Sequence, residues 1–128
     1  MLTDVRVGAH DGYDRVVMEF RGTGTPGWRV RYVKNPRLEG SGTRVRLGGD
    51  SALSVVADRT TYPGEGEGYY DGPARLTGPG DPVTDVYVGG TFEGYTAAYV
   101  GVDGSKPPFR VFRLTDPVRL VVDVSAGS

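Results

Sequence analysis

The sequence contains no cysteine and a single histidine, His10. It can therefore form neither a disulfide framework nor a thiolate zinc site, and it lacks the pair of histidines that many metal centres use. We predict no bound metal and no cofactor. His10 lies in the turn sequence His-Asp-Gly and beside no serine of a nucleophile motif, which favours a surface histidine over a catalytic one.

Long apolar segments are also absent, so we expect no membrane span and no signal peptide within these 128 residues. An exported protein would carry its signal segment outside this sequence. Helix-forming windows are scarce, because 21 glycines and nine prolines interrupt nearly every stretch of about a dozen residues. The length fits one domain, residues 1–128, with enough chain to bury one hydrophobic core.

Neither positive nor negative charge is in large excess, since the net charge is −1. No global field therefore draws the chain to nucleic acid or to a membrane surface, and we predict no nucleic-acid partner. The charges are nevertheless unevenly distributed. Residues 1–47 carry nine Lys/Arg against five Asp/Glu, and residues 48–128 carry six against eleven. This asymmetry indicates a basic face on one side of the domain.

Apolar and polar residues alternate with period two in many short segments, which is typical of β-strands with one buried face. The segments are residues 5–7, 15–21, 28–32, 43–47, 53–57, 83–91, 95–102, 109–114 and 118–124. Among the most buried side chains we expect Val16, Met18, Phe20, Val30, Leu120 and Val122. Asp-Gly, Gly-Gly and X-Pro turn sequences separate the segments. The predicted fold class is all-β, a two-layer antiparallel β-sandwich of eight or nine strands.

Residues 58–82 form the longest interruption of this pattern, with Gly or Pro at ten of 25 positions. We predict an irregular Gly/Pro-rich loop, and loops of this length are often functional. Its acids Glu65, Glu67 and Asp71 match no calcium-loop spacing and are interpreted as solvated loop acids.

Segments near both ends of the chain carry a family resemblance. They are residues 10–17 (HDGYDRVV), 109–112 (FRVF) and 114–124 (LTDPVRLVVDV), together with 89–94 (GGTFEG). In these segments the chain resembles the AMIN and AMIN-like domains of bacterial envelope proteins, the last segment being similar to the actinobacterial variant. The resemblance spans nearly the whole chain. It implies a β-sandwich, an extracytoplasmic setting in the envelope or in a secreted lipoprotein, and attachment to peptidoglycan or a related wall polymer.

Arginine side chains are the first candidate binding residues. If residues 28–33 and 43–47 pair as a hairpin, alternation places four arginines on one sheet face. Like charges opposite one another destabilise a sheet, so such a face favours an anionic partner. The alternative is an ordinary solvated face with acids from neighbouring strands as counter-charges. The residues are Arg29, Arg31, Arg44 and Arg46, which Lys34 and Arg37 in the connecting segment could extend.

Tyrosines of the long loop, Tyr62, Tyr69 and Tyr70, are the second candidates. Tyrosine presents a flat apolar face with a polar tip, which suits stacking on sugar rings or on a protein surface. The alternative is that these rings fold back as a lid over one open end of the sandwich. The other large aromatic residues that alternate with polar ones are predicted to be core: Trp28, Phe92, Phe109 and Phe112.

Together these features favour a non-catalytic cell-envelope module that recognises cell-wall glycan or another anionic polymer. The alternative is a protein-protein interaction domain that docks an envelope protein through an edge strand or through residues 58–82. An enzyme would need a pocket with convergent carboxylates, for which the sequence supplies no motif. Residues 22–27 match a dinucleotide-binding glycine pattern, but the strand-like sequence that follows replaces the required helix.

Overall fold

The structure, a computed structural model, describes residues 1–22, 25–38, 40–60, 68–80 and 82–126. The described residues form nine β-strands and no helix. In chain order the strands are β1 (Leu2–His10), β2 (Tyr13–Phe20), β3 (Trp28–Val33), β4 (Ser51–Ala57), β5 (Arg75–Thr77), β6 (Val83–Phe92), β7 (Tyr95–Val102), β8 (Phe109–Leu114) and β9 (Val118–Ser125).

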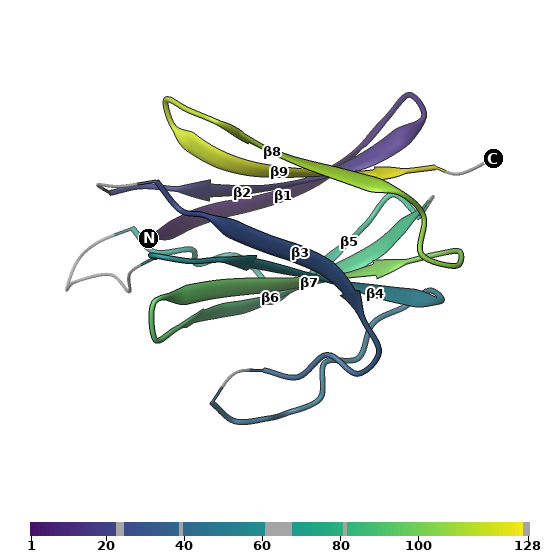
Figure 1. The fold of residues 1–128 in the computed structure, drawn as a ribbon, viewed down its shortest axis with the longest axis horizontal. Coiled ribbons are helices and arrows are strands. Elements are labelled where there is room, and N and C mark those ends of the chain that lie inside the picture. The colour runs from purple at the N-terminus through teal and green to yellow at the C-terminus, as the bar shows by residue number, and fades with distance from the viewer. Residues whose placement is uncertain (23–24, 39, 61–67, 81, 127–128) are drawn as a thin grey trace.

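The strands are arranged in two antiparallel sheets that pack face to face (Figure 1). The four-stranded sheet has the order β1-β2-β9-β8, and the five-stranded sheet has the order β3-β4-β7-β6-β5. The first and last parts of the chain thus lie in the same sheet, where β2 pairs with β9 along its whole length. The predicted all-β, two-layer antiparallel sandwich is confirmed.

One hydrophobic core fills the space between the sheets. Alternate residues of β2 and β9 point into it, and all of the positions predicted to be most buried are buried except Val30, which is half-buried against the core. The five-stranded sheet contributes the facing layer. Its fully buried members are Leu53, Val55, Ala57, Val83, Val86, Ala98, Val100 and Val102.

Two-residue turns fix the register of two hairpins. Asp11 and Gly12 join β1 to β2, with Gly12 at a φ of +86°. Glu93 and Gly94 join β6 to β7, and both have positive φ, 49° and 85°. Positive φ at both central residues characterises the type I′ turn, whose twist matches that of the flanking strands. The β6–β7 hairpin therefore runs to its tip without a flexible loop.

Residues 43–47, predicted as a strand paired with residues 28–33, form no strand. β3 pairs instead with β4 along its whole length. Residues 43–47 contribute one isolated bridge, between Arg37 and Arg44. The reason is burial. Alternate residues of β4 are fully buried in the core, whereas Val45 and Leu47 pack outside it, against the outer face of the five-stranded sheet.

Residues 58–82 are not irregular throughout, because they contain β5. This short strand pairs with β6, with Leu76 opposite Val86, and Leu76 packs against the core. A strand of three residues is too short to show a periodic pattern, which is why the alternation in the sequence does not reveal it.

The outer face of the four-stranded sheet carries charged residues that pair with one another. Arg15 lies opposite Asp123, and its Nε and Nη2 atoms donate to the two carboxylate oxygens at 2.7 and 3.0 Å. Arg110 donates to the same carboxylate at 3.1 Å. Both guanidinium groups lie over the rings of Tyr13 and Phe112. Covered in this way, Asp123 is only 4% exposed although it points away from the core.

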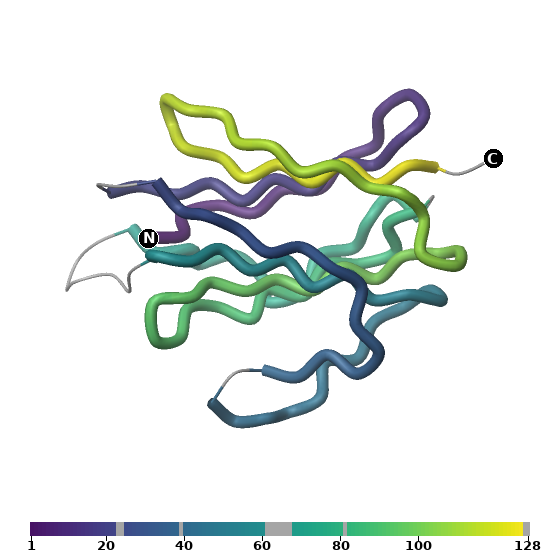
Figure 2. The backbone as a smooth tube through the Cα atoms, viewed as in Figure 1, coloured from purple at the N-terminus to yellow at the C-terminus, as the bar shows by residue number. Residues whose placement is uncertain are grey.

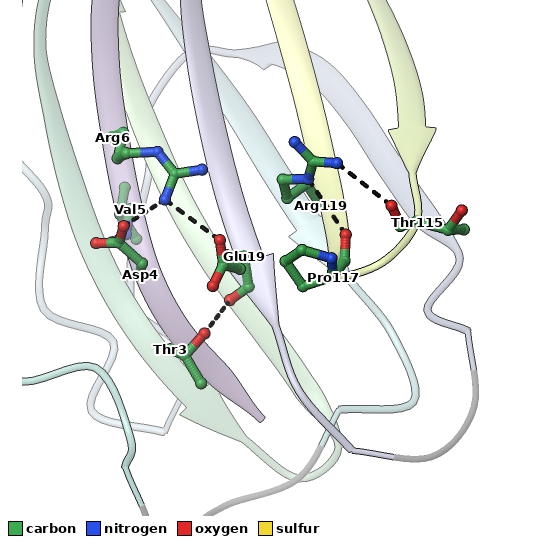
Figure 3. Close-up of polar contacts among 8 residues, drawn as sticks. All are labelled: Thr3, Asp4, Val5, Arg6, Glu19, Thr115, Pro117 and Arg119. Carbon is green, nitrogen blue, oxygen red and sulfur yellow. Dashed lines mark hydrogen bonds and ion pairs between the residues drawn. The ribbon is translucent and has the colours of Figure 1, made fainter.

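Glu19 and Arg119 also lie opposite each other on β2 and β9, but each bonds to a different group. Arg6 on β1 donates to the carboxylates of both Asp4 and Glu19 (Figure 3). Arg119 instead donates to two carbonyl oxygens of the β8–β9 turn, at 3.2 and 3.3 Å. These arginines are therefore engaged within their own sheet.

Truncating Leu120 to Ala should lower the free energy of unfolding by about 2–5 kcal/mol, because a buried side chain of β9 would leave a cavity. Leu114→Ala on the neighbouring β8 is the matched control and should cost less than about 1 kcal/mol, since Leu114 is 37% exposed. Urea denaturation followed by the fluorescence of the single tryptophan measures both. Equal costs would contradict the inward orientation of Leu120.

Replacing Asp123 by Asn should cost about 1–3 kcal/mol at pH 7, because it removes hydrogen bonds between charged groups. Burial raises the pKa of the Asp123 carboxyl, but the hydrogen bonds from Arg15 and Arg110 outweigh burial and hold that pKa below its ordinary value. This stabilisation is present above the unfolded-state pKa of about 3.9 and is lost as the pH falls through the folded-state pKa. The stability difference between the two proteins should therefore shrink below about pH 4. Urea denaturation across a pH series would refute this if the difference stayed constant.

Candidate functional site

Between β3 and β4 the chain leaves the sandwich and folds over the outer face of the five-stranded sheet (Figure 2). We call the described residues of 34–50 the excursion. Its two arms are joined by backbone hydrogen bonds, from Val45 N to Pro36 O and from Leu38 N to Thr43 O, both 2.9 Å. The excursion is thus a narrow two-armed loop lying on a sheet face that would otherwise meet solvent.

Apolar packing holds the excursion in place. Val45 is buried, and Leu38 and Leu47 are half-buried beside it. Gly89 leaves room for this contact, because a Cβ there would lie 3.2 Å from both Leu38 Cδ2 and Tyr99 Cε2. The residues beneath the excursion are Val56, Tyr87, Ala97 and Tyr99. The excursion covers only part of this sheet face, and two hollows lie beside it.

The first hollow is a groove of about 530 Å³, lined by β3, the excursion and the tip of the β6–β7 hairpin. We call it the aromatic groove. Three exposed rings line it, Trp28 at the start of β3 and Phe92 and Tyr95 on either side of the hairpin turn. They are 40%, 39% and 53% exposed, and only Leu114 among the other large hydrophobic residues of the described chain is exposed.

Small side chains on the sheet face leave space within the groove, and a glycine of the excursion allows the Phe92 ring to pack closely against it. The sheet face within it is lined by Ser54, Val56, Gly89 and Ala97. The Phe92 ring lies against Gly40, where an added Cβ would approach the ring to 3.0 Å. Gly40 also has a φ of +83°, so both its backbone and its surroundings favour glycine.

Cationic side chains line the same groove. Arg29 and Arg31 project from β3 and are exposed, and their side chains make no hydrogen bond or ion pair within the described chain. Arg37 also lines the groove, and its Nη1 donates to Gly42 O at 3.1 Å. The two unpaired guanidinium groups are therefore available to an anionic ligand that lies across the rings.

Among the described residues that line the groove, two are acidic, Asp58 and Glu93. Asp58 Oδ1 accepts hydrogen bonds from the Gly27 amide at 2.7 Å and from Arg59 Nε at 3.1 Å. These hydrogen bonds, the first above all, hold the pKa of Asp58 below its ordinary value. The Asp58 carboxylate is thus anionic and already engaged at neutral pH.

The four arginines predicted to share one face are divided between the two hollows. Arg29 and Arg31 line the aromatic groove, whereas Arg44 and Arg46 line the second hollow together with Lys34. The division follows from the pairing of β3 with β4, which leaves the second arm of the excursion away from β3.

Tyr69 and Tyr70 turn inward rather than outward. Both are half-buried against the core, and the Tyr69 hydroxyl lies 3.0 Å from Thr91 Oγ1. Thr91 continues a buried chain of hydroxyl contacts to Thr96 at 2.7 Å and on to Thr60 at 2.8 Å. The two rings therefore fold back onto the core, which is the direction that the alternative interpretation of the sequence gave them. The third tyrosine, Tyr62, lies outside the described residues.

Sequence reasoning placed Trp28 and Phe92 in the core, and this is wrong because both are exposed. The signal that could have found the groove is the sequence Phe92-Glu93-Gly94-Tyr95. A two-residue turn places its flanking residues opposite each other at the hairpin tip, beyond the body of the sheet, and Phe92 is indeed paired with Tyr95. Of the other two predicted core residues, Phe109 is half-buried against the core, as predicted. Phe112 is half-buried on the outer face of the four-stranded sheet, where the guanidinium groups of Arg15 and Arg110 lie over its ring, so its assignment to the core was wrong.

Groups that could hold a metal are not found in the described part of the chain, where no three His, Cys, Asp or Glu residues converge. Over the same residues, no helix has the length and apolar character needed to cross a membrane. The chemistry that the groove offers is non-covalent: flat rings for stacking and unpaired guanidinium groups for anions.

The described residues thus form a β-sandwich that carries an open groove lined by exposed rings and arginines. The sequence profile of the AMIN-like domain family matches residues 1–126, and the chain belongs to this family. AMIN-like domains are typically extracytoplasmic, generally non-catalytic binding modules, and membership indicates a cell-envelope-related module. No curated protein and no solved structure matches the chain.

Replacing Tyr69 by Phe should lower the free energy of unfolding by about 1 kcal/mol, because Thr91 would lose a partner in a partly buried hydroxyl chain. Tyr95→Phe removes an equivalent hydroxyl from a ring that is 53% exposed and should leave stability unchanged within about 0.5 kcal/mol. Thermal and urea denaturation measure both. A Tyr69→Phe protein as stable as the control would show that the hydroxyl chain does not tie residues 68–70 to the sandwich.

Proposed function

We propose that this domain is a non-catalytic, extracytoplasmic module that binds peptidoglycan or a related wall glycan in the aromatic groove. The observation that carries the proposal is the gathering, along one groove, of three exposed rings and two arginines whose side chains have no partner among the described residues. Exposed large rings are costly to leave in water, and a contiguous group of them marks a binding surface.

The chemistry of the groove suits a glycan that bears carboxylates. Flat apolar ring faces such as those of Trp28 and Tyr95 stack on the apolar faces of sugar rings. Arg29 and Arg31 can each grip a carboxylate bidentately. A volume of about 530 Å³ lies within the range of ligand sites and would hold a short oligosaccharide segment.

A protein partner is the second candidate, and the position of β3 favours it. β3 forms one edge of the five-stranded sheet, directly beside the groove. An extended segment of an envelope protein could add to this edge by main-chain hydrogen bonds, with its side chains in the groove.

Cosedimentation with purified peptidoglycan, stripped of phosphate polymers by hydrofluoric acid, tests the glycan proposal. Arg29→Ser with Arg31→Ser should weaken binding about tenfold or more, because hydrogen bonds to charged groups contribute about 1.5–3 kcal/mol each. Tyr95→Ala should weaken it about threefold to tenfold through the loss of stacking. Melting temperatures should stay unchanged, since these side chains make no hydrogen bond or ion pair within the described chain. Wild-type binding should also fall as salt rises.

Arg44→Ser with Arg46→Ser is the matched control, because it removes the same charge from the other hollow. Its binding to stripped peptidoglycan should remain within about twofold of wild type. If the folded groove variants bind as wild type does, the glycan site is rejected. Gel filtration with envelope proteins then tests the β3 edge.

A further inference from the structure

The second hollow differs in chemistry from the aromatic groove. It is a cleft of about 580 Å³ between the excursion, the start of β4 and Lys106. We call it the basic cleft. Its cationic residues are Lys34, Arg44, Arg46 and Lys106. All four are exposed, and none makes an ion pair within the described chain.

The acid of the basic cleft is already engaged. Asp50 is the one acidic residue among the described lining residues, and its Oδ2 accepts a hydrogen bond from Gly104 N at 2.8 Å. This contact joins Asp50, just before β4, to the loop that follows β7, so Asp50 supports the backbone of that loop instead of pairing with a cleft cation. The lining therefore carries four positive groups against one negative group.

Backbone contacts hold Lys106 at the cleft. Ser51 Oγ donates to Gly104 O at 2.8 Å and accepts from Lys106 N at 3.0 Å. Lys106 itself has a φ of +53°, which is uncommon for a residue with a side chain and persists where the surroundings hold it. Lys106 is thus brought to the other cations by a loop anchored to the start of β4.

Stacking plays little part in this cleft. The ring of Tyr32 is half-buried, and its hydroxyl donates to Pro107 O at 2.5 Å. Val33, Val45 and Leu47 are half-buried or buried. A ligand would be recognised by charge, and four cations in one cleft call for several closely spaced anionic groups rather than a single carboxylate.

We propose that the basic cleft is a second binding site, separate from the aromatic groove, for a linear phosphate polymer such as a polyphosphate or phosphodiester chain. Arg44 and Arg46 bind phosphate oxygens bidentately, and Lys34 and Lys106 add point charges. A concave cleft accommodates a chain better than a flat lipid surface. Its lining also lacks the exposed apolar side chains that accompany cations on membrane-binding faces.

Isothermal titration calorimetry with inorganic polyphosphate at low salt tests this site. Arg44→Ser with Arg46→Ser, and separately Lys34→Ser with Lys106→Ser, should each weaken binding about tenfold or more. Arg29→Ser with Arg31→Ser removes the same charge from the groove and should change binding less than about threefold. Circular dichroism and melting temperature verify that every variant is folded.

Two further probes identify the ligand chemistry. Polyglutamate, which has similar charge spacing but carboxylates, should bind at least about tenfold more weakly than polyphosphate. Vesicles of phosphatidylglycerol should bind wild type and the cleft variants alike. Three outcomes would overturn the proposal. They are equal losses of polyphosphate binding in all three double variants, polyglutamate binding as tight as that of polyphosphate, and vesicle binding that is lost in the cleft variants alone. Stripped peptidoglycan carries no phosphate polymer, so failure here leaves the groove result unaffected.

Discussion

The packing of the excursion against the outer face of the five-stranded sheet is the contact on which both hollows depend. Val45 is buried there, outside the main core, beside Ala97 and Tyr99. Without this cover, the side chains on the outer face of the sheet would be exposed to solvent. The excursion forms the sides of the two hollows on this face. Because Gly89 has no side chain, Leu38 of the excursion can approach the sheet closely.

Both outer faces of the sandwich carry ion pairs, Arg75 with Asp85 on the five-stranded side among them, but the two arginines of β3 have none within the described chain. On the four-stranded sheet, Arg15 and Arg110 converge on Asp123, and Arg6 on Glu19. On the five-stranded side, Arg29 and Arg31 line the groove without a partner in the described chain. An unpaired guanidinium group can bind an anion without first giving up an internal contact. The overall charge of −1 therefore hides a local gathering of cationic side chains around the two hollows on this side of the molecule.

Sequence reasoning reached the fold more securely than the site. Within the described residues, alternation located eight of the nine strands, missed the short β5, and wrongly predicted a strand at residues 43–47. The site was reached in part. Arg29 and Arg31 do line a groove, but Trp28 and Phe92 were assigned to the core because alternation reports which face of a strand a residue is on and not what covers that face. At a strand end or a hairpin tip the inward face can be open.

The sequence by itself determined the class of fold, because period-two alternation and turn residues are local properties that a single strand can satisfy. It also determined the family, through segments at both ends of the chain. The tertiary structure alone decided that β3 pairs with β4 and that the second arm of the excursion crosses the sheet. Pairing partners are chosen by competition for burial among segments distant in sequence. The core is filled by Leu53, Val55 and Ala57 of β4, and not by Val45 and Leu47 of the excursion. Because β4 took the place beside β3, the four arginines are divided between two hollows.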